Sequence, residues 1–124
     1  MKTSTWLRGT RFDIVLLSET DEREFESFFE GLTEADQKQV DAILERMADH
    51  GPILNVEKSR ELEDGIYEFK TKNVRIFWFY DEGRIVLISH GKMKNALTKN
   101  SSYRPEVDRA KRLRARWRAQ KEGE

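Results

Sequence analysis

The sequence predicts an α+β domain in which a mostly antiparallel β-sheet of about four strands packs against an N-terminal helical hairpin. Apolar residues recur at helical spacing between residues 20 and 50 and alternate at strand spacing between residues 66 and 90. A basic helical segment then follows a proline near the C-terminus. The 124 residues have room for one domain, so we expect a single domain over residues 1–124, with residues 120–124 frayed.

The first half of the chain predicts one strand and then two helices. Residues 12–17 (FDIVLL) are short, apolar and β-branched, which is typical of a strand. Thr20 and Thr33 can each cap a helix, and Gly51-Pro52 ends the second one because glycine favours a left-handed C-cap and proline cannot continue a helix. The apolar faces of the two helices are Phe25, Phe28, Phe29 and Leu32, then Val40, Ile43, Leu44 and Met47.

The second half predicts three strands and a helix. Residues 67–71, 74–80 and 84–90 are strand-like, and the short turns between them favour an antiparallel meander. Pro105 suits the first position of a helix, and the segment after it is rich in lysine and arginine. The apolar stripe of this basic helix is Val107, Ala110, Leu113 and Trp117.

Composition excludes several kinds of chemistry. The chain has no cysteine, which removes thiolate nucleophiles, disulfides and cysteine-based zinc sites. Its two histidines, His50 and His90, lie forty positions apart and form no metal-ligand motif, so we expect neither a metal nor another cofactor. The sequence also has no signal peptide and no segment that could span a membrane, which predicts a cytoplasmic protein without a membrane partner.

Charge is divided unevenly along the chain, although the formal net charge is zero. Residues 1–68 contain 8 basic and 17 acidic residues, whereas residues 69–124 contain 15 basic and 6 acidic residues. Such an asymmetry is typical of a surface that binds a polyanion. Ordinary solvated helix faces would explain it equally well, so charge alone does not decide between the two interpretations.

Polar residues are expected to converge at one end of the meander. The turn at Lys72-Asn73 makes Lys70 and Arg75 cross-strand neighbours, and antiparallel order brings Arg75 back beside the segment that follows the third strand. The predicted cluster is Glu68, Lys70, Arg75, His90, Lys92 and Lys94. Arginine matches the geometry of phosphate oxygens, and histidine titrates near neutral pH, so this set suits RNA cleavage without a metal.

Each member of this cluster also has a purely structural explanation. Glu68 and Lys70 can form a solvated strand face, and Arg75 can pair with Glu68 at the surface. His90 can be a buried histidine whose hydrogen bonds are satisfied. The basic helix near the C-terminus is by default a solvated face.

Five segments in a fixed order resemble the RelE/HigB/ParE toxin superfamily, most closely its HigB-like, phage-derived branch. They are residues 47–52 (MADHGP), 62–70 (LEDGIYEFK), 74–80 (VRIFWFY), 88–94 (ISHGKMK) and 105–110 (PEVDRA). The resemblance implies a RelE-like fold and the toxin of a type II toxin–antitoxin pair. Such a toxin would be an mRNA interferase, an endoribonuclease that cleaves mRNA in the ribosomal A site and inhibits translation. Its partner would be an antitoxin, often of helix-turn-helix type.

The resemblance also implies which residues act. It places the catalytic cations at Arg75, Lys92 and Lys94, and a tyrosine for base stacking or proton transfer at Tyr103; we add His90 for its own chemistry. The residues predicted to contact RNA or phosphate are Lys70, Glu68, Lys99, Arg104 and Arg112. The alternative is a non-catalytic binding module, either a ParE-like inhibitor of a protein target or a degenerate toxin that only binds its antitoxin.

Overall fold

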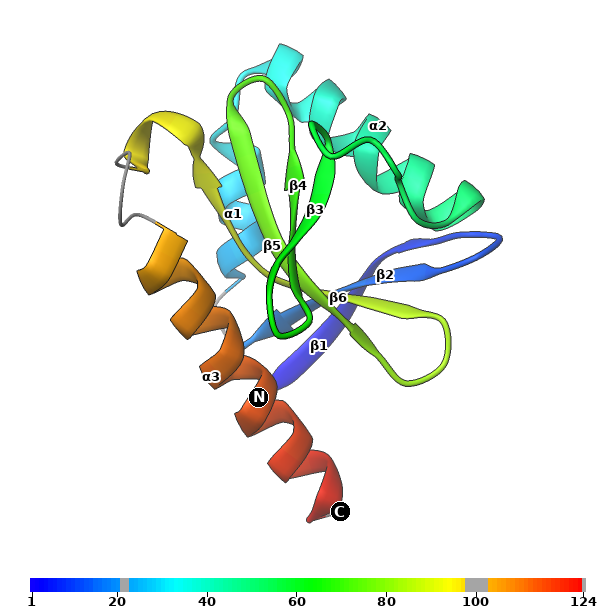
Figure 1. The fold of residues 1–124 in the computed structure, drawn as a ribbon, viewed down its shortest axis with the longest axis vertical. Helices are drawn as coiled ribbons and strands as arrows, with labels where there is room; N and C mark the ends of the chain where they lie inside the picture. The colour runs from blue at the N-terminus through cyan, green and yellow to red at the C-terminus, as the bar shows by residue number, and fades with distance from the viewer. Residues whose placement is uncertain (21–22, 98–102, 124) are drawn as a thin grey trace.

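A six-stranded mixed sheet forms the centre of the computed structural model, which describes residues 1–20, 23–97 and 103–123 (Figure 1). The strand order is β1-β2-β6-β5-β4-β3. All neighbouring strands are antiparallel except β2 and β6, which are parallel. The strands are β1 (Lys2–Arg8), β2 (Asp13–Ser18), β3 (Ser59–Glu63), β4 (Ile66–Lys70), β5 (Val74–Asp81) and β6 (Ile85–Met93).

Helices cover both faces of this sheet. One buried cluster joins residues of α1 (Glu24–Glu30) and α2 (Glu34–His50) to side chains such as Ile76 and Trp78 on one face. A second cluster joins α3 (Tyr103–Glu122) to Ile66 and Phe79 on the other face. A short 3-10 helix, η1 (Lys94–Ala96), follows β6. The central strands are therefore buried on both sides, which explains why β5 carries an almost continuous apolar run.

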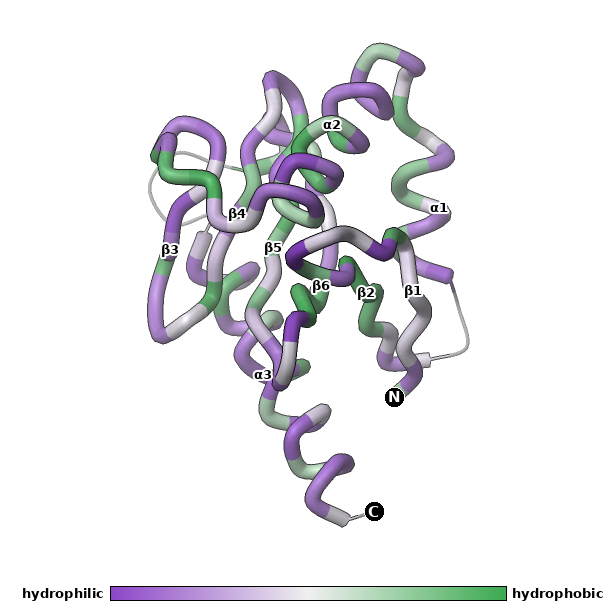
Figure 2. The backbone as a smooth tube through the Cα atoms, turned by 90° about the vertical axis from the view of Figure 1, so that its right-hand side faces the viewer, coloured by the Kyte–Doolittle hydropathy of each residue, from purple (hydrophilic) through white to green (hydrophobic). Residues whose placement is uncertain are grey.

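The expected sheet of about four mostly antiparallel strands, packed against an N-terminal helical hairpin alone, is wrong. The structure adds β1 and β3, pairs β2 with β6 in parallel and places α3 on the second face. Both missed strands lie at the edges of the sheet, where polar and exposed side chains hide the apolar alternation that predicts a strand (Figure 2). The antiparallel meander of β4, β5 and β6 is present as expected.

Local capping explains where the second helix begins and ends. The Thr33 hydroxyl accepts a hydrogen bond from the Asp36 backbone N–H at 3.2 Å, and Gly51 ends α2 with a φ of 81°, as predicted. Thr20 does not cap α1, because the residue before this helix is Arg23, which makes no side-chain cap. Within the described part of the chain, no helix combines the length and apolar character that crossing a membrane requires.

Candidate functional site

Three cations lie side by side across the meander. Lys70 on β4 pairs with Arg75 on β5, which pairs in turn with Lys92 on β6. Residues that are directly opposite on neighbouring strands share a face, so the three side chains emerge together on the face that α3 covers. We call Lys70, Arg75 and Lys92 the cation row. Like charges at this spacing repel one another unless an anion lies between them. The row favours a site that receives a negatively charged ligand.

Arg75 keeps part of its hydrogen-bonding capacity unused. Its side chain is 9% exposed, and Nη1 donates to the backbone carbonyls of Thr71 at 2.6 Å and Val74 at 3.0 Å. Nε is buried and has no hydrogen-bond partner among the described residues, none of which forms a carboxylate ion pair with Arg75. A guanidinium held by neutral carbonyls retains its full charge for a phosphate.

A second row of side chains lies next to the cation row on the same face. It consists of Glu68 on β4, Phe77 on β5 and His90 on β6, which pair across the strands. Glu68 is fully buried, and its Oε1 accepts a hydrogen bond from Arg60 Nε at 2.8 Å. Its other oxygen, Oε2, has no partner among the described groups, so the carboxylate can still accept one hydrogen bond or proton.

Tyr103 connects the two rows at the start of α3. Its ring packs edge-on against Phe77, with 6.1 Å between centroids, and the Arg60 guanidinium lies 5.7 Å from the ring centroid. Burial raises the pKa of Tyr103, and the nearby Glu68 carboxylate adds to the rise, whereas Arg75 opposes it. The phenol therefore stays protonated at neutral pH, close to both Glu68 and Arg75.

His90 lies deeper than its neighbours on β6. The register shift between Phe77 and Trp78 leaves Ser89 as the extra residue of a β-bulge, and this bulge turns His90 toward α3. The His90 ring stacks on Phe77, with 4.8 Å between the ring centroids. Ser89 Oγ lies 2.8 Å from Nδ1, and Glu106 Oε1 lies 2.9 Å from Nε2. Because the ring is 4% exposed and both nitrogens are engaged, His90 does not offer a nitrogen to a substrate in this arrangement.

Burial, with a smaller effect of the Arg109 charge, lowers the pKa of His90 from 6.5 to about 4. The neutral ring then donates Nε2–H to the Glu106 carboxylate and accepts the Ser89 hydroxyl at Nδ1.

Protein stability should consequently fall as pH drops from about 6.5 toward 4, because the unfolded chain binds a proton that the folded one excludes. The loss due to His90 is at most roughly 3 kcal/mol, at 1.36 kcal/mol per pKa unit. Urea unfolding at pH 7 and pH 5 should show a smaller difference for His90→Gln than for the wild type. An equal difference in both proteins would contradict this assignment.

The other predicted site residues are divided between the cluster and its surroundings. Lys94 is exposed in η1, next to the cation row, and its backbone N–H donates to Asn73 at 2.7 Å. Arg104 binds Glu63 and Asp108, and Arg112 is exposed further along α3. Lys99 lies outside the described residues. The structure thus brings together Lys70, Arg75, Lys92, Glu68, His90 and Tyr103. Arg104 borders this cluster beside Tyr103 but is bound to Glu63, and Arg112 lies further along α3.

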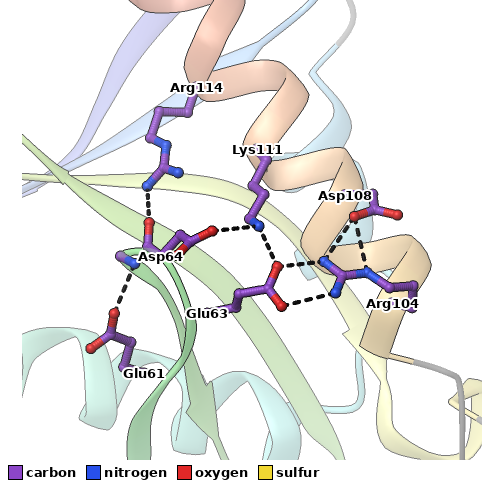
Figure 3. Close-up of polar contacts among 8 residues, drawn as sticks. Glu61, Glu63, Asp64, Arg104, Asp108, Lys111 and Arg114 are labelled. Atoms are coloured by element: carbon purple, nitrogen blue, oxygen red, sulfur yellow. Dashed lines mark hydrogen bonds and ion pairs between the residues drawn. The ribbon is translucent and has the colours of Figure 1, made fainter.

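The basic face of α3 meets acidic groups at the turn between β3 and β4 (Figure 3). Arg104 donates to both carboxylate oxygens of Glu63, at 2.9 and 2.7 Å. Lys111 binds Glu63 and also Asp64, the latter at 2.9 Å, and Arg114 donates to the Asp64 backbone carbonyl at 2.6 Å. These contacts tie the helix to the edge of the sheet.

Further ion pairs involve three more cations of this helix. Arg109 binds Glu24 of α1 at 2.6 Å, and Arg116 binds Glu19. Lys121 binds Asp81 at 2.8 Å. The acidic first half of the chain and the basic second half therefore meet within the folded protein. This pairing differs from both sequence-based interpretations, an open polyanion surface and a solvated face.

Two residues of the cluster escaped the sequence analysis. Arg60 lies on β3, an edge strand that the sequence pattern does not reveal, and no sequence signal separates Glu106 from other acidic residues in a first helical turn. Arg60, Tyr103 and Val107 line a shallow pocket of about 330 Å³ between β3 and α3. Across residues 1–20, 23–97 and 103–123, no three histidine or carboxylate side chains are grouped in a way that could hold a metal ion.

Comparison with known proteins assigns the chain to a family. A family model described as phage-derived protein, Gp49-like (DUF891), matches residues 27–115, a range that includes the cation row, Glu68, Tyr103 and Glu106. Comparison with individually curated proteins gave no match. The Gp49-like family is phage-derived and associated with RelE/HigB-like toxins, which implies an antitoxin as partner. Since the match covers well over half of the chain, this protein belongs to the Gp49-like family of phage-derived proteins.

Proposed function

We propose that this protein is the toxin of a type II toxin–antitoxin pair and acts as a ribosome-dependent mRNA endonuclease. The observation that carries the proposal is the cation row, in which Arg75 has no carboxylate partner among the described residues. A toxin that acts only by binding a protein does not need phosphate-binding groups arranged in this way. Membership of a toxin-associated family supports the same conclusion.

The proposed reaction is transesterification within the RNA strand. The 2′-oxygen of one nucleotide attacks the adjacent phosphorus, and the bond from phosphorus to the 5′-oxygen of the next nucleotide breaks. The products are a 2′,3′-cyclic phosphate and a 5′-hydroxyl end. The protein must accept the proton of the 2′-hydroxyl, stabilise the negative charge of the phosphorane and protonate the leaving oxygen.

The cations of the site stabilise the phosphorane. Arg75 places its positive charge beside the phosphorane oxygens, and Lys70 and Lys94 add positive charge around it. Lys92, whose side chain is 41% exposed, reaches the leaving 5′-oxygen and gives it a proton. Each of these groups lies on the meander or directly after it, so the sheet holds them at constant spacing.

Tyr103 and Glu68 handle the other proton. The Tyr103 hydroxyl passes its own proton to the free oxygen of Glu68 while it accepts the proton of the attacking 2′-hydroxyl. Because its pKa is raised, a free phenolate would be costly, and this relay avoids forming one. Glu68 then carries the proton and Lys92 has lost one, and exchange with water restores both.

Replacing Tyr103 with phenylalanine should lower kcat by about 100-fold, because proton relay by a positioned side chain contributes at least that much. KM should change little, since the ring remains available to stack on a base. Steady-state cleavage on programmed ribosomes measures both constants. Tyr80→Phe, on the opposite face of the sheet, is the matched control and should cleave normally. Equal rates for Tyr103→Phe and the wild type would exclude the relay.

The function itself is tested by inducible expression with mapping of mRNA 5′ ends. The proposal requires growth arrest together with new cleavage sites that carry 5′-hydroxyl ends and depend on translation. Growth arrest without RNA cleavage would instead indicate a toxin that inhibits a protein target. Absence of both effects would indicate a degenerate toxin that only binds its antitoxin.

A further inference from the structure

A buried carboxylate joins α3 to the cation row. Glu106, in the first turn of α3, is 7% exposed, and its two oxygens face different partners. Oε1 lies 2.9 Å from His90 Nε2, and Oε2 lies 3.4 Å from Lys92 Nζ. A carboxylate is rarely buried without a charged or hydrogen-bonded partner. The contacts with His90 and Lys92 therefore offset the cost of burying Glu106.

We infer that Glu106 is a positioning residue, which holds Lys92 over the phosphate site while His90 holds Glu106 in place. This inference rests on the proposed function, because it assigns Lys92 a part in the reaction. His90 orients the Glu106 carboxylate but does not neutralise its charge, since the neutral ring donates one hydrogen bond to Glu106 and receives another from Ser89. Lys92 is therefore the cation that forms an ion pair with Glu106.

Charge balance within the cation row supports the same conclusion. Lys92 lies directly opposite Arg75, and without a counter-ion the two cations would push each other apart. Among the described residues, Glu106 is the carboxylate that pairs with Lys92, whereas Arg109, the next cation along α3, pairs with Glu24. Glu106 thus keeps the Lys92 ammonium beside Arg75 and still leaves it 41% exposed toward a ligand.

The geometry makes one substitution especially informative. Glu106→Gln can still accept a hydrogen bond from His90 Nε2–H, but it has no charge with which to hold Lys92. Glu122→Gln is the matched control, because Glu122 lies on the same helix, is exposed and forms no ion pair with a described residue. Both variants change one acid into its amide within α3.

The first measurement does not depend on activity. Nuclear magnetic resonance relaxation of the Lys92 side chain should show that its ammonium group becomes more mobile in Glu106→Gln and stays as ordered as in the wild type in Glu122→Gln. The His90 ring should keep the tautomer with hydrogen on Nε2. Unchanged mobility of the Lys92 ammonium in Glu106→Gln would overturn the inference, whatever the protein does to RNA.

The second measurement is a double-mutant cycle on RNA cleavage. Glu106→Gln should lower kcat by about tenfold with little change in KM, and adding it to Lys92→Ala should cause no further loss. Additive losses would mean that Glu106 acts independently of Lys92, which would overturn the positioning role while leaving the nuclease assignment intact. If the wild type cleaves no RNA while the mobility of Lys92 still responds to Glu106→Gln, the proposed function fails and the contact between Glu106 and Lys92 stands.

Discussion

Arg75→Ala is expected to lower the rate of RNA cleavage by about two to three orders of magnitude, the usual cost of removing a donor that stabilises an oxyanion. Arg75 is the middle member of the cation row, and its guanidinium is held by the backbone carbonyls of Thr71 and Val74. Alanine removes the charged donor in the middle of the cation row, which the lysines on either side of it do not replace.

Cleavage on programmed ribosomes, together with growth after induction, measures this effect. Arg46→Ala is the matched control, because Arg46 is exposed on α2 and lies away from the α3 face. Arg75→Lys should recover part of the rate, since it restores charge without the fork of donors. Circular dichroism verifies that each variant is folded. Wild-type cleavage by a folded Arg75→Ala protein would refute the catalytic assignment of the cation row.

Leu113→Ala is expected to destabilise the protein by about 2–5 kcal/mol, the usual cost of truncating a buried leucine. Leu113 is 1% exposed and packs in the cluster that joins α3 to Ile66, Phe79 and Leu87. Because α3 carries Tyr103 and Glu106 into the site, cleavage should be lost at a lower temperature in this variant than in the wild type. Urea unfolding measures the first effect, and cleavage at increasing temperature measures the second.

Two further variants separate apolar packing from the ion pairs of the helix. Leu54→Ala removes a leucine that is 90% exposed, so it should leave stability unchanged. Glu63→Gln removes the carboxylate whose pKa is lowered to about 2 by Arg104 and Lys111, and solvent weakens such surface pairs. We therefore expect a much smaller loss than for Leu113→Ala. A larger loss for Glu63→Gln would show that ion pairs, rather than apolar burial, hold α3 on the sheet.

Local sequence patterns predicted the helices and strands that bury one apolar face and the helix that has a capping residue at its start. The faces of α1 and α2 contribute Phe25, Val40 and Met47 to the core, and Thr33 caps α2. The meander was also predictable, because short turns leave the chain few other ways to continue. From its register, Lys70, Arg75 and Lys92 could be expected near one another.

Edge strands and long-range contacts were not predictable in this way. β1 and β3 are mostly polar and exposed, and their residues pair through backbone groups that no side-chain pattern records. Arg60 was missed together with β3. The depth of His90 also depends on a single bulge at Ser89, since a shift of one residue moves a side chain to the opposite face.

Short-range patterns were enough to predict the meander, the capped second helix and the types of residue that a phosphate site would use, because these depend on neighbours in the chain. Which charges remain available for a ligand depends on the packing of α3 against the sheet. When α3 packs on the second face of the sheet, its cations Arg104, Lys111 and Arg109 pair with Glu63, Asp64 and Glu24, and the helix brings Tyr103 and Glu106 to the cation row. Charges that lie far apart in the sequence can cancel only once the fold places them within a few ångströms of each other.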